Sequence, residues 1–184
     1  MRRLVWVARA LVFSTLVAAP AVAPPAHAKR VALVVGINKY DNLPRERQLV
    51  KAVNDARSIE VALKSVGFEV VKAEDVGRSA FNLAWQQLLN KLSPGDEVAV
   101  FFSGHGVEIE GGNYLIPRDV PAVGTGEARR LKNESLSFDE MRRDLAAQGP
   151  RITLFILLRR QSWRRGVEKI QSMSSPTSAN PSRG

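Results

Sequence analysis

The chain of 184 residues contains no cysteine. Without cysteine there is no disulfide framework, no thiolate metal site and no cysteine nucleophile. Histidine is nearly as scarce: the two residues are His27 and His105, and His27 lies in a segment that we expect to be removed. One remaining histidine among scattered carboxylates does not have the ligand spacing of a metal site, so we expect no metal or other cofactor.

The chain also lacks any balance between basic and acidic residues at its ends. It has 27 Lys and Arg residues against 18 Asp and Glu residues, which gives a formal net charge of +9. Residues 29–158 carry 18 basic and 17 acidic residues, whereas residues 159–184 carry six basic residues and one acidic residue. Because the central part is nearly neutral, we do not expect nucleic acid as a partner.

No apolar run near the N-terminus is long enough for a membrane-spanning helix. Two arginines follow Met1, residues 10–19 form a short apolar run, and Ala26-His27-Ala28 has the A-x-A pattern of a cleavage site. We therefore predict a signal peptide over residues 1–28, a periplasmic or secreted protein that begins at Lys29, and no stable membrane span after cleavage. An uncleaved anchor is the alternative, and the interrupted apolar run disfavours it.

The rest of the sequence alternates between strand-like and helix-like segments. Short runs rich in β-branched and aromatic residues predict buried strands, and apolar residues at three- and four-residue steps predict amphipathic helices. The predicted strands are 30–37, 68–71, 98–102 and 152–158, with a short one at 114–116; the predicted helices begin at Gln48, Ser79 and Ser137. This order predicts an α/β fold with a mostly parallel sheet and helices on both faces.

The segment Ser103-Gly104-His105-Gly106 directly follows the buried run 98–102, and we interpret it as a tight polar turn. Open α/β sheets bind ligands and perform chemistry at the carboxyl ends of their strands. Glycines on either side of a histidine allow the backbone to approach a substrate closely or to adopt positive φ. His105 is therefore the first candidate for a catalytic residue; the plainer alternative is an incidental histidine in a Gly-rich turn.

Five segments, in this order, resemble the caspase-like cysteine peptidases (peptidase C14), close to the bacterial metacaspase-type domains. They are VALVVGINKY (31–40), NDA (54–56), LKSVGF (63–68), FFSGHG (101–106) and NYLIP (113–117). The resemblance implies a caspase-like three-layer α-β-α sandwich whose C-terminal part is missing. It predicts an incomplete caspase-like domain over residues 29–158 and a basic, disordered tail over residues 159–184.

The resemblance also implies a cysteine-type endopeptidase that acts on peptide or protein substrates, with specificity for Arg or Lys. His105 corresponds to the general base of its Cys-His dyad, and the backbone N–H of Gly106 to a donor of its oxyanion hole. Asp55 resembles an acidic residue of the pocket for the basic side chain. The alternative for Asp55 is an exposed helix carboxylate that offsets Lys51 or Arg57.

The sequence departs from the family where the nucleophile is expected, after the strand ITLFILL (152–158). The family has an Asp-x-Cys motif there, whereas this chain continues as RRQSW (159–163). Ser162 is a poor substitute because a hydroxyl is a far weaker nucleophile than a thiol. We therefore expect an endopeptidase domain that is inactive as written; a non-catalytic caspase-fold protein that binds peptides or proteins is the alternative.

Two further interpretations concern the region after Leu158 and the fold class. A frameshift near Leu158 would account both for the lost motif and for the Ser- and Pro-rich composition of residues 159–184. A flavodoxin-like domain for phosphate ligands is a third possibility for the whole chain, but Gly36-Ile37-Asn38-Lys39 is a poor match to the Gly-rich turn which that fold requires.

Overall fold

The computed structural model describes residues 28–124 and 126–160. Residues 1–27, with almost the whole predicted signal peptide, and residues 161–184, with most of the predicted tail, lie outside the described residues. The strands are β1 (Arg30–Gly36), β2 (Glu69–Glu74), β3 (Glu97–Ile109), β4 (Gly112–Leu115), β5 (Leu136–Ser137) and β6 (Ile152–Arg160). The helices are η1 (Arg45–Arg47, a 3-10 turn), α1 (Ala52–Ser65), α2 (Arg78–Lys91), α3 (Ala128–Glu134) and α4 (Phe138–Ala147).

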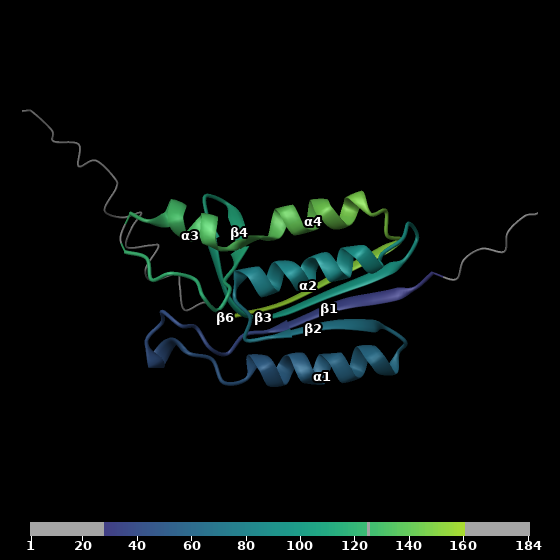
Figure 1. Ribbon diagram of the computed structural model, residues 1–184, viewed down its shortest axis with the longest axis horizontal. Coiled ribbons are helices and arrows are strands. Elements are labelled where there is room, and N and C mark those ends of the chain that lie inside the picture. The colour runs from purple at the N-terminus through teal and green to yellow at the C-terminus, as the bar shows by residue number, and fades with distance from the viewer. Residues whose placement is uncertain (1–27, 125, 161–184) are drawn as a thin grey trace, which may run out of the picture.

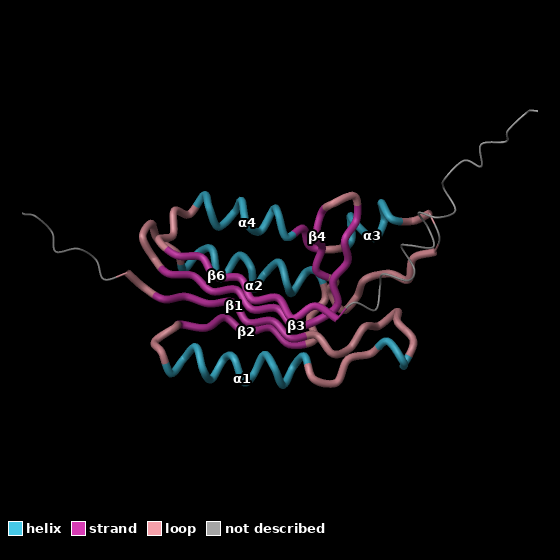
Figure 2. The backbone as a smooth tube through the Cα atoms, turned by 180° about the vertical axis from the view of Figure 1, so that it is seen from behind, coloured by secondary structure: helices cyan, strands magenta, loops and turns pink. Residues whose placement is uncertain are grey.

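The described chain forms three layers, with one mostly parallel sheet between two layers of helices. Strand β1 pairs in parallel with β2 and β3, and β3 pairs in parallel with β6; β4 and β5 extend the sheet with antiparallel pairing. Helix α1 covers one face, and α2 and α4 cover the other (Figures 1 and 2). The predicted α-β-α arrangement and parallel sheet are confirmed.

The central strands are buried on both faces because their side chains alternate between the two helix layers. Leu33, Val35 and Phe102 pack toward α2 and α4 in the larger apolar cluster. Val34 and Phe101, which are paired in the β1–β3 register, form a smaller cluster with α1. A continuous apolar run, rather than a strict alternation, is the sequence signature of this two-sided burial.

The predicted turn at residues 103–106 is wrong, because β3 continues without interruption from Glu97 to Ile109. Its first half pairs with β1 and β6, and its last four residues form an antiparallel hairpin with β4. None of the positive-φ glycines lies in this segment. Gly104 serves close packing instead, since a Cβ there would lie 2.7 Å from the Phe102 ring and 2.9 Å from the Tyr40 hydroxyl.

Helix ends follow the sequence in some places and not in others. Gly67 ends α1 with φ +86°, and the Ser137 hydroxyl caps α4 by accepting the Glu140 N–H, both as predicted. The predicted Ser79 cap is wrong: α2 begins after Gly77, and the carboxylate of Asp119 accepts the first N–H of the helix, from Arg78. Helix α1 begins at Ala52 rather than at Gln48, and α3 was not predicted at all.

Strand β6 has a single partner strand, β3, within the described residues. Its side chains toward α2 and α4 are partly covered, as shown by the edge-to-face contact of Phe155 with Phe138 at 4.9 Å between ring centroids. On the α1 face, Leu154 and Leu158 are about half exposed, at 49% and 47%. Within the described part of the chain, β6 thus has an unpaired edge and one partly exposed face.

None of the helices in the described residues is both long and apolar enough to cross a membrane.

Candidate active site

His105 lies fully buried in β3, just past the point where the neighbouring strand β1 ends. Its Nε2 atom is 2.7 Å from the backbone carbonyl oxygen of Arg47, in the short turn η1. A carbonyl oxygen only accepts hydrogen bonds, so Nε2 donates a hydrogen in this contact. The contact fixes the orientation of the ring.

Tyr40, from the loop after β1, supports the same histidine from a second side. Its hydroxyl oxygen accepts the backbone N–H of His105 at 2.7 Å, and the two rings are 4.6 Å apart between centroids. Burial raises the pKa of the Tyr40 hydroxyl well above its ordinary value; the His105 N–H works in the opposite direction, and the charge of Asp75 adds to the rise. Tyr40 therefore stays neutral and acts by position, not by proton transfer.

Gln48 closes the loop that carries both supports of the histidine. Its side-chain carbonyl accepts the Tyr40 N–H at 2.8 Å, and its amide group donates to the carbonyl oxygens of Tyr40 at 2.9 Å and Leu43 at 2.8 Å. Arg47, whose carbonyl oxygen contacts the His105 ring, directly precedes Gln48, so these hydrogen bonds also position the histidine. The apolar periodicity placed Gln48 at a helix start, and no local pattern indicates this role.

Asp75 anchors the beginning of the same loop at the end of β1. Its carboxylate accepts the N–H groups of Asn38 at 2.7 Å and Lys39 at 3.0 Å. Asp75 itself has φ +48°, in the left-handed region that costs a non-glycine residue roughly 1 kcal/mol. The two hydrogen bonds offset that strain, so the carboxyl edges of β1 and β2 are tied together beside His105.

Asp55 lies in the first turn of α1 and faces the same edge of the sheet as His105. One of its carboxylate oxygens accepts a hydrogen bond from the buried Ser103 hydroxyl at 3.3 Å, and Ser103 is two residues before His105 on the α1 face of β3. Asp55, Ser103 and the segment 48–52 line a hollow of about 290 Å³. Asp55 and Ser103 therefore lie at the same end of the sheet as His105, although His105 itself is not among the residues that line the hollow.

The alternative role for Asp55, as a partner of Lys51 or Arg57, is not observed within residues 28–124 and 126–160. Both ion-pair distances of Arg57 are to Glu74, at 2.9 and 2.7 Å. Asp55 forms no ion pair with any described residue, although Lys51 lines the same hollow. Within the described residues, the half-buried carboxylate accepts a hydrogen bond from the Ser103 hydroxyl and has no ion pair, which suits the binding of a cationic group.

Gly106 follows His105 in β3 and lies opposite Leu115 in the hairpin with β4. The N–H of Ile116 donates to the carbonyl oxygen of His105 at 3.0 Å, which makes the Gly106–Leu115 pair a non-hydrogen-bonded one. The N–H of Gly106 therefore points away from β4. On that side β3 pairs with β6, and the register places the Gly106 N–H next to Arg160. The role of Gly106 as an oxyanion-hole donor stays a prediction.

The strand register shows where a nucleophile would have to lie. In the β3–β6 pairing, the partner of His105 is Arg160, and the partner of Ser103 is Leu158. Ser162, the hydroxyl that the sequence offered as a substitute, lies outside the described residues. The position beside the base is therefore occupied by an arginine in this sequence. Among the described residues no group of three or more His, Asp or Glu side chains could hold a metal ion.

Comparison with known proteins relates this arrangement to a protein family and to solved structures. A family model described as the caspase domain matches residues 29–176, and it continues past Leu158 into residues that the structure does not describe. A crystal structure of a protein from Geobacter sulfurreducens is similar in fold, with a TM-score of 0.51 and 19% sequence identity. The alignment covers 70% of this chain and 50% of that one, so this chain spans half the length of that protein. No curated protein matches the sequence.

Proposed function

Because the chain belongs to the caspase-domain family, we propose that its site is that of a cysteine-type endopeptidase for Arg- or Lys-containing peptides and that, as written, it binds such peptides without cleaving them. One observation carries the proposal: in a chain without cysteine, Arg47 and Tyr40 hold His105 two residues along β3 from Ser103, which lines a hollow together with Asp55. The predicted membership of this family is confirmed, while the metacaspase-type specificity is part of the proposal.

The chemistry of the family explains why the missing residue matters. In a Cys-His dyad, Nδ1 of the histidine takes the thiol proton, the sulfur attacks the scissile carbonyl carbon, and the histidine then protonates the leaving amine. An N–H in the place of Gly106 stabilises the negative charge that develops on the carbonyl oxygen. In this proposal His105 takes the place of the histidine and Gly106 that of the N–H donor. Because the thiol is missing, no acyl-enzyme forms, and the site can bind a peptide but not cleave it.

The hollow beside Asp55 supports the choice of a basic side chain. Asp55 supplies a carboxylate without a cationic partner among the described residues, and Ser103 holds it in place. A guanidinium or ammonium group that enters the hollow would exchange water for a charge-assisted hydrogen bond, which is worth about twice a neutral one. The hollow is therefore more favourable for Arg or Lys than for an uncharged side chain of the same shape.

Peptide binding tests this proposal directly. Fluorescence anisotropy compares a labelled peptide that contains Arg with the same peptide in which citrulline, an uncharged isostere, replaces Arg. We expect the Arg peptide to bind at least tenfold more tightly, and the preference to be lost in Asp55→Asn. Glu60→Gln is the matched control, because Glu60 lies on the same helix but pairs with Lys64 and Lys72.

Two results would contradict the proposal. Equal affinity for the Arg and citrulline peptides would remove the assigned specificity. Hydrolysis of the peptide above the buffer rate, if it disappeared in His105→Ala, would show that the chain has a working nucleophile other than cysteine.

We infer in addition that residues 1–28 act as a signal peptide and that the protein is exported to the periplasm or secreted. Strand β1 begins at Arg30, the second residue after the proposed cleavage point between Ala28 and Lys29, so cleavage there would leave the strand intact. Export of the full chain from a bacterial host, followed by N-terminal sequencing of the product, tests this proposal. An intact N-terminus that remains with the cells would contradict it.

A further inference from the structure

The main chain of Lys29 is held on both sides where it enters β1. Its N–H donates to a carboxylate oxygen of Asp96 at 2.9 Å, and its carbonyl oxygen accepts the N–H of Glu97 at 2.8 Å. Asp96 belongs to the turn between α2 and β3, at the edge of the sheet opposite to His105. The residue that follows the proposed cleavage point is thus fixed to the sheet by its own backbone.

Asp96 is a buried carboxylate, with 3% of the residue exposed. Its second oxygen accepts the N–H of Ser93 at 2.8 Å, and the Lys29 ammonium lies 3.7 Å away. Burial by itself raises the pKa of Asp96, but the hydrogen bonds from the Lys29 and Ser93 N–H groups and the Lys29 charge outweigh it, so the pKa lies below its ordinary value. Asp96 is therefore ionised and directed at the Lys29 nitrogen.

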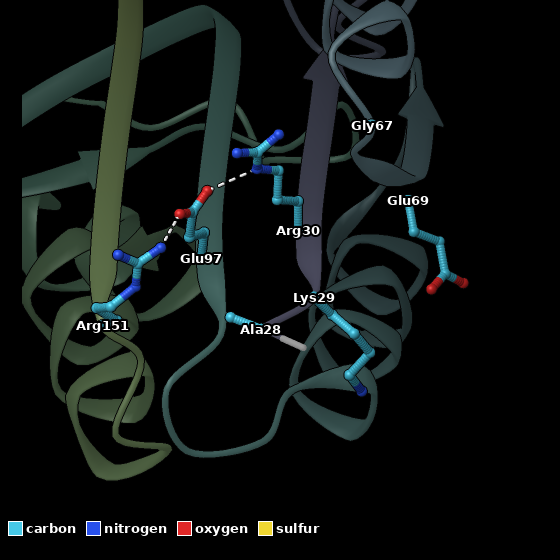
Figure 3. Close-up of a pocket in the computed structure, with 7 residues that line it drawn as sticks. All are labelled: Ala28, Lys29, Arg30, Gly67, Glu69, Glu97 and Arg151. Carbon is cyan, nitrogen blue, oxygen red and sulfur yellow. Dashed lines mark hydrogen bonds and ion pairs between the residues drawn. The ribbon is translucent and has the colours of Figure 1, made fainter. Parts of the chain in front are cut away.

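The other charges around this point are already engaged with each other. Figure 3 shows a hollow, of about 580 Å³, in which Arg30 and Arg151 both reach Glu97. The Lys29 ammonium makes its closest contact with the carbonyl oxygen of Lys91, at 2.6 Å, rather than with Asp96. Among the described residues, the buried carboxylate is thus held by two neutral N–H donors and by one cation at 3.7 Å.

We propose that Asp96 is a binding site for the α-ammonium group that forms at Lys29 when the bond between Ala28 and Lys29 is cut. The amide N–H that now donates at 2.9 Å becomes a charged group, in the same place, beside a buried carboxylate. Cleavage is a hydrolysis: water adds across the Ala28–Lys29 peptide bond, the leader leaves with a carboxylate, and the new amine takes up a proton. Removal of the leader thereby completes an ion pair inside the folded domain.

The physical consequence is that cleavage stabilises the fold. A charge-assisted hydrogen bond is about twice as strong as the neutral one that it replaces, and it gains from the low exposure of Asp96. The hollow next to Ala28 leaves room for water to take the hydrogens of the ammonium that do not point at Asp96 (Figure 3). A chain that keeps even one residue before Lys29 cannot place its ammonium at this position.

The experiment compares two chains that differ only at this point. The mature chain, residues 29–184, and the extended chain, residues 28–184, are each released from the same cleavable fusion, and their thermal midpoints are measured at pH 7. We expect the mature chain to melt roughly 3–6 °C higher. The product exported from the full chain is sequenced in parallel and is expected to begin at Lys29.

Two variants assign the effect to Asp96. In Asp96→Asn the difference between the mature and extended chains is expected to disappear, whereas Glu97→Gln, in the same hollow but without a contact to the Lys29 α-nitrogen, is expected to keep it. If Asp96→Asn does not fold, acylation of the α-amine with a slow reagent at pH 7 replaces it. A bound ammonium is then expected to react at least tenfold more slowly in the mature chain than in the extended chain.

The proposal is overturned if the two chains melt within 1 °C of each other and their α-amines react at the same rate. It is also overturned if the exported protein begins at any residue other than Lys29. It depends on the proposed signal peptide but not on peptide binding at Asp55, so failure of the citrulline comparison leaves it unaffected.

Discussion

A cysteine introduced at position 160 is expected to restore the missing half of the dyad. The β3–β6 register pairs His105 with Arg160, and residues paired in neighbouring strands lie about 4.8 Å apart with side chains on the same face. A thiol in Arg160→Cys would therefore lie within hydrogen-bonding reach of the histidine ring. Position 158, paired with Ser103, lies two residues away and provides a control thiol on the same face.

The size of the expected effect follows from the role of the base. General base catalysis contributes about 10²–10⁴-fold to a rate, which corresponds to roughly 3–5 kcal/mol of transition-state stabilisation. Arg160→Cys is expected to react with a peptidyl-Arg chloromethyl ketone about 10²-fold faster than Leu158→Cys. Removal of the histidine in Arg160→Cys/His105→Ala is expected to abolish that advantage.

The assay is the rate of covalent labelling, followed by intact mass, together with release of a fluorogenic leaving group from an Arg substrate. Equal labelling rates for Arg160→Cys and Leu158→Cys would refute the assignment of position 160. An Arg160→Cys rate that is unchanged by His105→Ala would refute the assignment of His105 as a base.

Three further changes test the supports of the site and the fold. Gln48→Ala removes three hydrogen bonds around Tyr40 and is expected to lower the free energy of unfolding by about 2–3 kcal/mol in urea titrations; a loss below 0.5 kcal/mol would contradict the role of these hydrogen bonds. Asp119→Ala removes the acceptor for the Arg78 N–H and is expected to cost about 1 kcal/mol, with amide exchange faster in the first turn of α2 than elsewhere. Because the pKa of Asp96 is lowered in the fold, ionised Asp96 stabilises the fold fully above about pH 4, and this stabilisation is lost as the pH falls through the folded pKa. In Asp96→Asn the free energy of unfolding is expected to fall less steeply with acid. An unchanged dependence on pH would contradict this role of Asp96.

Sequence patterns predicted the elements whose signal is local. The runs that form β1, β3 and β6 are apolar on both faces, and the alternating order of strands and helices predicted one sheet between two layers of helices. Gly67 and Ser137 marked helix ends because their effect needs only the adjacent turn of backbone. His105 was singled out because its neighbours formed a recognisable motif; it lies in β3, two residues past the last pair with β1, and its catalytic role stays a prediction.

The failures concern interactions between residues far apart in the chain. The Gly and Ser residues around His105 suggested a turn, but β3 continues because β4 and β6 supply backbone partners from later in the sequence. Ser79 satisfied the local rule for a cap, yet Asp119, some forty residues away, provides the acceptor. Gln48 forms its hydrogen bonds with the backbone of Tyr40, eight residues earlier, only once the loop has folded, so no local pattern marks it.

Three supports of His105 lie in segments that precede β6: the Tyr40 hydroxyl, the Arg47 carbonyl and, behind them, Gln48. His105 and the position paired with it, Arg160, therefore belong to separate segments that the β3–β6 pairing brings together. Substitutions in β6 can remove catalysis while the geometry of the base persists. In evolutionary terms, loss of cleavage carries little penalty in folding here, so a lineage can keep a formed site long after its chemistry has gone.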